Sequence, residues 1–188
     1  MSERRRHQRV RFAEGVRLRI GFDGQLVDAS LENLSLGGLM LRCSGELAIR
    51  KLYGVEIIFS ERMRIELVVQ LVNRVGDRYG ARFSPGPLSE AQIRLAVSDG
   101  LSAGRASTLS VKVEDGRRIL RVNGLLGSGM RADLVSALNS GVAEVDLSGV
   151  TAVDAEGREL CALIIGDPRA KIVRPAACVE RLLKSLAR

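Results

Sequence analysis

MRIELVVQLVNRV, residues 63–75, is the longest uninterrupted strand-like run in this 188-residue chain. Its apolar residues alternate with others, so Ile65, Leu67, Val69 and Leu71 share one face of an extended backbone. This period-two pattern predicts a long β-strand with one buried face.

Shorter runs with strand character lie on both sides of this segment, and no long helical pattern separates them. Asp23-Gly24 is a typical hairpin turn between the first two. Some six short strands in succession predict a small antiparallel barrel or sandwich. The other five runs are VRLRIGF (16–22), QLVDASLENLS (ending at 35), LMLRC (39–43), VEIIFS (55–60) and RYGARF (78–83).

The sequence pattern changes after residue 83. Ser89 and Gln92 have the spacing of a capping box, and Leu88 and Ile93 that of a hydrophobic staple, so a helix is predicted over 89–98. The small, polar residues that follow predict a linker. The predicted organisation is therefore a domain at 1–99, a linker at 100–107 and a second domain at 108–188.

The second half of the chain alternates strands with helices, which predicts an α/β layer. Two strands are expected to form a hairpin around Asp115-Gly116. The helix that follows is expected to begin at a Ser128 cap and to stop at Gly141, with one apolar stripe. That stripe is Met130, Leu134 and Leu138; further on, 142–149 and 170–173 are predicted strands, and 155–166 and the tail from Ala176 are predicted helices.

The net charge of +7 is concentrated at the start of the chain. Residues 1–11 carry five Arg and one Glu, whereas residues 12–100 are balanced. Of the 29 basic residues, 25 are Arg, whose planar fork binds phosphate in paired hydrogen bonds and stacks on aromatic rings. The N-terminal arm, residues 3–12, is thus suited to an anionic ligand.

Several other functional classes are disfavoured. The three cysteines form no CxxC pair, so we expect buried thiols in a reducing cytoplasm. No apolar stretch reaches the length of a membrane span, and no secretory signal is present. His7 is the only histidine, which argues against a His-rich metal site or a catalytic triad; we expect it to be solvated. Neither a P-loop nor a strand-linked GxGxxG occurs. We therefore expect no enzyme, no catalytic residue, no metal and no cofactor.

The segment NLSLGG, residues 33–38, complements the arm. Asn and Ser side chains start turns, and two glycines permit positive φ and close approach of a ligand to the backbone. Taken alone, the segment is an ordinary β-turn.

The arm and this segment together resemble the PilZ domain family, bacterial receptors for cyclic di-GMP. The matching pattern is Arg5-x-x-x-Arg9 followed by Asn33-x-Ser35-x-x-Gly38, and Gly80-Ala81-Arg82-Phe83 resembles the end of that domain. The resemblance covers residues 3–98. It implies that Arg5 and Arg9, with Arg6, bind guanine and phosphate of cyclic di-GMP. Asn33, Ser35, Gly37 and Gly38 would form the barrel wall of the site, while Arg4 and Arg11 match no fixed position and would only add charge.

Residues 108–188 resemble a degenerate STAS domain, most clearly in VDLSGVTAVDAEG (145–157). In phosphorylatable members a Ser follows the aspartate of this loop. Here Asp154 is followed by Ala155 and Glu156, so we expect no phosphoryl switch at that point. The resemblance implies a domain that makes protein contacts.

The leading hypothesis is a cyclic di-GMP receptor that relays the signal to an unidentified protein partner through its C-terminal domain. On binding, the arm would fold onto the barrel with Val10 and Phe12 as its anchors. One alternative is a PilZ-like scaffold that binds no ligand and acts by protein contacts. Another is a nucleic-acid binder that uses the basic arm, although charge balance beyond the arm and the 3% aromatic content make nucleic acid an unfavoured partner. The sequence leaves a homodimer and the regulated process open.

Overall fold

The computed structural model describes residues 7–13, 15–22, 24–83 and 85–186. The chain divides into two compact units, one comprising Arg6–Ser98 and the other Asp99–Arg188. Each unit has its own hydrophobic cluster. Among the described residues, none of the helices combines the length and the hydrophobicity that a membrane-spanning segment requires.

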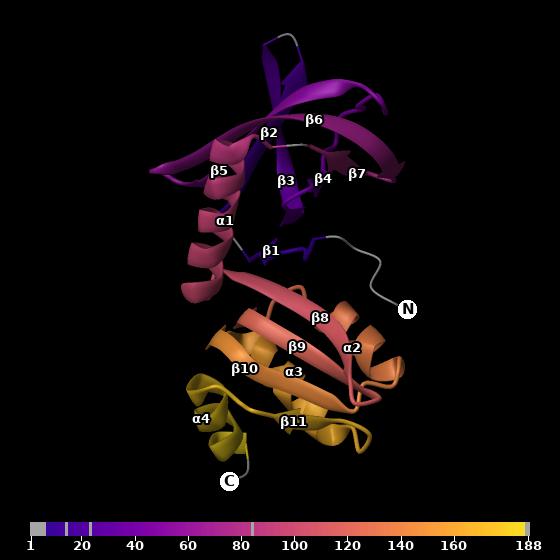
Figure 1. Ribbon diagram of the computed structural model, residues 1–188, viewed down its shortest axis with the longest axis vertical. Coiled ribbons are helices and arrows are strands. Elements are labelled where there is room, and N and C mark those ends of the chain that lie inside the picture. Colours follow the sequence, from indigo (N-terminus) through magenta and orange to yellow (C-terminus); the bar gives the residue numbers. More distant parts are fainter. Residues whose placement is uncertain (1–6, 14, 23, 84, 187–188) are drawn as a thin grey trace. The chain divides into compact units, whose positions relative to one another are not determined.

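The first unit is a closed antiparallel barrel, as predicted, with strand order β2-β3-β4-β7-β6-β5. Figure 1 shows these strands in indigo to magenta. Pairing of β2 with β5 closes the barrel, and β4 pairs with β7 instead of its chain neighbour β5. The strands are β2 (Arg17–Phe22), β3 (Gln25–Ser35), β4 (Gly38–Arg42), β5 (Leu52–Ser60), β6 (Met63–Val75) and β7 (Arg78–Arg82); a short strand, β1 (Arg11–Phe12), lies in the arm.

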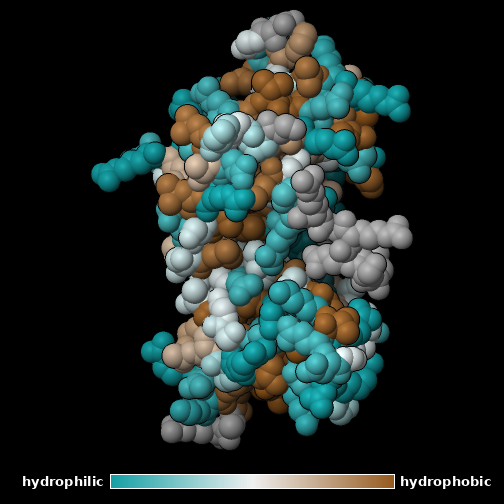
Figure 2. Space-filling model, in the orientation of Figure 1, coloured by the Kyte–Doolittle hydropathy of each residue, from teal (hydrophilic) through white to brown (hydrophobic). Residues whose placement is uncertain are grey.

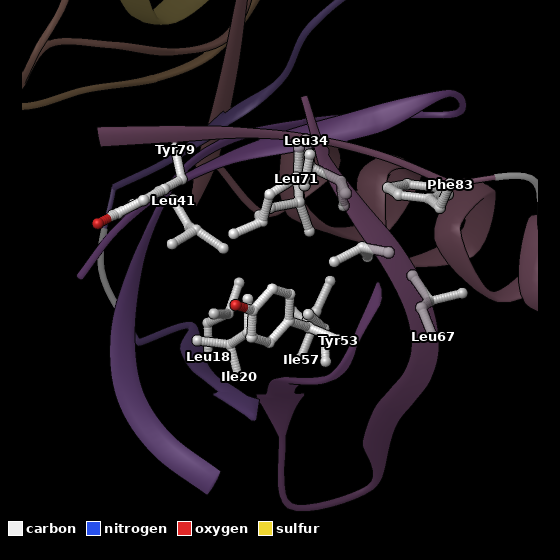
Figure 3. Close-up of a cluster of buried hydrophobic side chains, with 14 of the residues drawn as sticks. Leu18, Ile20, Leu34, Leu41, Tyr53, Ile57, Leu67, Leu71, Tyr79 and Phe83 are labelled. Carbon is white, nitrogen blue, oxygen red and sulfur yellow. The ribbon is translucent and has the colours of Figure 1, made fainter. Parts of the chain in front are cut away.

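Every second side chain along the strands points inward, and these side chains fill the barrel interior. The predicted inward face of β6 is confirmed, since Ile65, Leu67, Val69 and Leu71 are all buried. Side chains from the other strands converge on the same interior, as Figure 3 shows for Leu18, Leu41 and Ile57, among others. Hydrophobic side chains also reach the outer surface of the barrel strands (Figure 2), where the exposed ones include Leu52, Val68 and Val75.

Helix α1 (Pro87–Ser102) begins earlier and ends later than the predicted 89–98. Pro87 opens it because proline fits the first helical turn, where its missing N–H is not needed. Ser89 therefore lies inside the helix instead of capping it, and Leu88 is exposed while Ile93 is buried, so the predicted staple does not form.

The end of α1 is a Schellman motif at Gly104. This glycine has φ +64°, its N–H donates to Leu101 O at 3.2 Å, and Arg105 N donates to Gly100 O at 2.8 Å. Residues 100–102 are thus helical and β8 begins at Ala106, so these parts of the predicted 100–107 linker are regular secondary structure.

The second unit is an α/β layer built on the strand order β8-β9-β10-β11. Strands β8 and β9 form the expected hairpin, with positive φ at Asp115 and Gly116 as a type I′ turn requires, and the other pairings are parallel. The three helices contribute to one core with one face of this sheet (Figure 1). The elements are β8 (Ala106–Glu114), β9 (Arg117–Leu126), α2 (Arg131–Asn139), β10 (Glu144–Val153), α3 (Ala155–Gly166), β11 (Lys171–Val173) and α4 (Ala177–Leu186).

The start of α2 differs from the prediction. The predicted stripe of Met130, Leu134 and Leu138 is buried, and Gly141 follows the helix with φ +83°. Ser128, however, does not cap α2, because Met130 occupies the N-cap position and no side chain caps it; the Ser128 hydroxyl instead donates to Asp154 Oδ2 at 2.7 Å. Asp154 itself caps α3 by accepting from Gly157 N at 2.8 Å.

The described cysteines are packing residues. Cys43 and Cys161 are buried and Cys178 is half-buried, and none is in a disulfide. Burial, with a smaller effect of nearby Cys178, raises the pKa of the Cys161 thiol to about 11. This thiol is therefore protonated at neutral pH and unreactive.

Asp146 is the centre of an ion network on the sheet face that does not carry the helices. Its Oδ2 accepts from Arg174 at 2.8 Å and from Arg121 at 3.2 Å, and its Oδ1 accepts from Ser148 N at 3.1 Å. Burial alone would raise the pKa of this carboxyl, but the Ser148 hydrogen bonds and the two guanidiniums lower it below 3.8. Arg174 reaches it from a backbone with φ +48°, a conformation that costs free energy outside glycine.

We expect Asp146→Asn to destabilise the protein at pH 7, because it leaves two guanidiniums beside a neutral amide. A carboxyl with a lowered folded-state pKa stabilises the fold above pH 3.8 and loses that contribution as the pH falls through its folded pKa. The difference in unfolding temperature between wild type and Asp146→Asn should therefore shrink below pH 3.8. Thermal unfolding followed by circular dichroism from pH 7 to pH 2 measures it. A difference that is the same across this range would contradict the assignment.

Candidate ligand-binding site

The described part of the arm is fixed to strand β3. Val10 and Leu34 form an antiparallel bridge in which each amide N donates to the other residue's carbonyl O at 2.8 Å. Both side chains are buried, and the ring of Phe12 packs against that of Phe59 with centroids 5.1 Å apart. The prediction that Val10 and Phe12 anchor the arm on the barrel is confirmed.

This bridge determines which side chains share a face. Because Val10 lies opposite Leu34 in an antiparallel pair, Arg9 lies opposite Ser35 and Arg11 opposite Asn33. Leu34 belongs to the barrel core and Val10 is buried opposite it, so their neighbours on both strands point to the other side, the outer surface of the barrel. The structure thus brings Arg9, Asn33 and Ser35, predicted from separate motifs, onto one outer face.

Asn33 is the most constrained polar residue of this face. Glu32 is the extra residue of a bulge between the Leu31 and Asn33 pairings, and Asn33 is thereby set opposite Met40. Only 8% of Asn33 is exposed, and within the described ranges its Oδ1 is the buried side-chain N or O atom without a hydrogen-bond partner. Such an atom costs roughly 1–3 kcal/mol, and native structures retain it where it has a function.

The two glycines act by their size and not by positive φ, which neither adopts. They follow Ser35, whose hydroxyl donates to Gly38 O at 3.0 Å across a two-residue turn. A Cβ on Gly38 would lie 2.3 Å from Ala81 O, so no larger residue fits against β7. A Cβ on Gly37 would lie 3.1 Å from the His7 ring. His7 is therefore half-buried against this turn and is not fully solvated.

Acidic groups near this face are neutralised. The Glu32 carboxylate lies 2.9 Å from Arg42 and 3.8 Å from Arg78. The outer face around Asn33 and Ser35 therefore presents hydrogen-bonding groups and cationic side chains, a combination that suits a phosphate-bearing ligand. No group of His, Cys, Asp or Glu that could hold a metal ion occurs in the described part of the chain.

Two of the predicted site residues, Arg5 and Arg6, lie outside the described residues. The other five, Arg9, Asn33, Ser35, Gly37 and Gly38, gather on β3, the β3–β4 turn and the adjacent arm. Arg11, treated above as supporting charge, lies beside Asn33. Only the antiparallel register between Val10 and Leu34 places Arg11 beside Asn33. Neither motif indicates this pairing, because its two residues are 24 positions apart in the sequence.

Comparison with known proteins assigns the first unit. The family model for the PilZ domain matches residues 3–98. No curated protein matches the chain.

Solved structures to which this chain is similar include the PilZ domain of YcgR from Escherichia coli with c-di-GMP. It is 21% identical with a TM-score of 0.44, and the match covers 52% of this chain and 91% of that one. The MrkH–c-di-GMP complex from K. pneumonia is 18% identical with a TM-score of 0.45, and 53% of each chain is covered. The inhibitor of motility MotI/DgrA from Bacillus subtilis is 13% identical with a TM-score of 0.43, with 53% of this chain and 52% of that chain covered. The chain thus spans about half the length of the last two structures.

Proposed function

This chain belongs to the PilZ domain family, and from that premise we propose that its barrel is a receptor for cyclic di-GMP. The arm and the Asn33–Gly38 segment carry the pattern by which the chain resembles ligand-binding members. The function proposed is recognition of a second messenger and not catalysis.

One observation carries the proposal. The Val10–Leu34 bridge holds Arg9 beside Ser35 on the same outer face as the unpartnered Asn33 Oδ1. Guanine offers N–H donors on its Watson–Crick edge and O6 and N7 acceptors on its Hoogsteen edge, so it can satisfy both an amide oxygen and an Arg fork. Phosphate supplies the anionic partner for a second guanidinium. We assign these contacts to Arg5, Arg6, Arg9, Asn33, Ser35, Gly37 and Gly38.

The second unit would relay the signal. We propose that residues 108–188 form a degenerate STAS-like domain that binds a protein partner. In support, a β-hairpin is followed by alternating helices and strands, and Asp154 caps α3 in the loop that resembles that family. Separate expression of residues 108–188, followed by cooperative thermal unfolding, tests whether this segment is a domain.

Thermal unfolding of the full chain with and without cyclic di-GMP tests the receptor function. A ligand at a hundred times its Kd stabilises the folded state by about 2.7 kcal/mol, so the barrel transition should move upward. Single-stranded DNA is the control for the nucleic-acid alternative, and binding to it should fall steeply between 50 and 200 mM salt if it occurs at all. A shift with DNA and none with cyclic di-GMP would favour that alternative. No shift with either would favour the scaffold without a ligand.

Asn33→Ala should separate binding from stability. Removing the unpartnered oxygen relieves its desolvation cost, so the free energy of unfolding of the free protein should stay constant or rise. The same change deletes a ligand contact and should raise the Kd for cyclic di-GMP about tenfold, as expected for one hydrogen bond of roughly 1.5 kcal/mol. Ser30→Ala, an exposed change on the same strand, is the control for both measurements. Unchanged affinity in Asn33→Ala would remove this residue from the site.

A further inference from the structure

We propose that Arg82, at the end of β7, is a further ligand-binding residue that grips a phosphate of the cyclic dinucleotide. This inference rests on the proposed function. Arg82 lies 44 residues from Gly38 in the sequence, and the motifs of the arm and loop do not include it.

The sheet register places Arg82 at the site. Gly38 pairs with Ser35 on one side and with Arg82 on the other. Ala81 and Phe83 are buried, so Arg82, which is exposed, points to the outer surface that also carries Ser35 and Arg9. Figure 1 shows β3, β4 and β7 as neighbouring strands.

These four residues form one row across neighbouring strands, in the order Arg9, Ser35, Gly38, Arg82. The middle of the row carries no large side chain, because Ser35 is small and Gly38 has no side chain; we call these two residues the Ser35–Gly38 floor. Three strand spacings of about 4.8 Å put the Cα atoms of the two arginines roughly 14 Å apart or less on a curved sheet. Two long cationic side chains thus flank a floor with no bulky side chain between them.

Such an arrangement suits a ligand with anionic groups on two sides. Cyclic di-GMP carries two phosphates, so Arg9 and Arg82 could each bind one in a charge-assisted fork while the nucleotide lies on the Ser35–Gly38 floor. Arg82 can make this contact without breaking an existing one, since its guanidinium has neither a hydrogen bond nor an ion pair within the described structure. The neighbouring arginines Arg42 and Arg78 on the same face are instead committed to Glu32.

The backbone at the end of β7 is held on both sides, which supports a ligand-binding role for Arg82. Phe83 N donates to Gly37 O at 3.2 Å, which ties the chain just after Arg82 to the turn of the loop motif. The backbone of Arg82 is therefore held by β4 on one side and by Gln70 of β6 on the other. A preorganised backbone lowers the entropy lost when the side chain binds.

Calorimetric titration of the full chain with cyclic di-GMP tests the inference with four proteins. Wild type should bind, Arg82→Ala should raise the Kd tenfold or more, and Arg82→Lys should lie between them because it retains the charge without the fork. Arg78→Ala is the matched control, since Arg78 points to the same outer face of the same strand, roughly 13 Å away along it. Its affinity should stay within about twofold of wild type, because its exposed ion pair contributes little.

The possible outcomes separate the two proposals. If wild type binds and Arg82→Ala binds equally well, Arg82 is not a ligand-binding residue and the receptor function still stands. If Arg78→Ala loses as much affinity as Arg82→Ala, only the general charge of this face matters, and the specific contact is refuted. If wild type does not bind, both proposals fail. Equal unfolding temperatures of the free wild type and Arg82→Lys show that a loss of affinity is not a loss of fold.

Discussion

Arg9→Ala is expected to raise the Kd for cyclic di-GMP ten- to a hundredfold while the unfolding temperature of the free protein hardly changes. Arg9 is exposed and lies opposite Ser35 on the outer face assigned to the ligand, so its side chain lies outside the core. A charge-assisted fork of this kind contributes roughly 1.5–3 kcal/mol, which corresponds to the stated loss of affinity.

Calorimetry measures this effect, with Arg17→Ala as the control for removing an exposed arginine of the barrel. We expect the same loss for Arg5→Ala, by the resemblance of Arg5 and Arg9 to the family's paired arginines. Wild-type affinity in Arg9→Ala would contradict the assignment of the arm to the ligand.

Gly38→Val should impair both binding and folding. A Cβ at this position would lie 2.3 Å from Ala81 O, so β4 and β7 would have to separate where Gly38 pairs with Arg82. Overpacking of this kind costs about 1–3 kcal/mol. The same displacement distorts the floor beside Ser35, and affinity for cyclic di-GMP should fall more than tenfold.

Chemical denaturation and calorimetry together measure the two effects of Gly38→Val. Gly86→Ala is the matched control, because a Cβ there meets nothing within 4 Å and Gly86 has no positive φ. A Gly38→Val protein with normal stability would show that the backbone can give way at this point, contrary to the packing described above.

The strands of the barrel were largely predictable, and their pairing was not. Alternation identifies the inward face of β6 from local sequence alone, because a strand repeats every two residues. Closure through β2 and β5 and the crossover that pairs β4 with β7 depend on contacts between distant segments. No local pattern contains that information, so the strand pattern alone left both a barrel and a sandwich open, and only the family resemblance favoured the barrel.

Helix ends were predicted less well, because capping residues compete. Ser89 and Ser128 both have the chemistry of a cap, yet Pro87 starts α1 two residues earlier and Asp154 takes the hydroxyl of Ser128. Helix α1 continues through Gly100 and stops before Gly104, which has the positive φ of a helix end, whereas the prediction ended the helix at 98.

In the candidate site, too, some residues are recognised from short sequence motifs, whereas others are recognised only from contacts between segments far apart in the sequence. The resemblance carried by the arm and loop motifs pointed to Arg9, Asn33, Ser35 and the two glycines as candidate site residues. Arg82 and Arg11 join them only through strand register, and the reason for the glycines proved to be space beside Ala81 and His7 and not backbone conformation.

In the proposed function, the barrel binds cyclic di-GMP at the face formed by the arm and the β3–β4 turn. Isothermal titration of the full chain with cyclic di-GMP, run in parallel on wild type and Arg9→Ala, tests it most directly. We expect a saturable heat for wild type, with an affinity that is ten- to a hundredfold weaker in the variant. A wild-type titration with no saturable heat, or one that is identical for the two proteins, would contradict it.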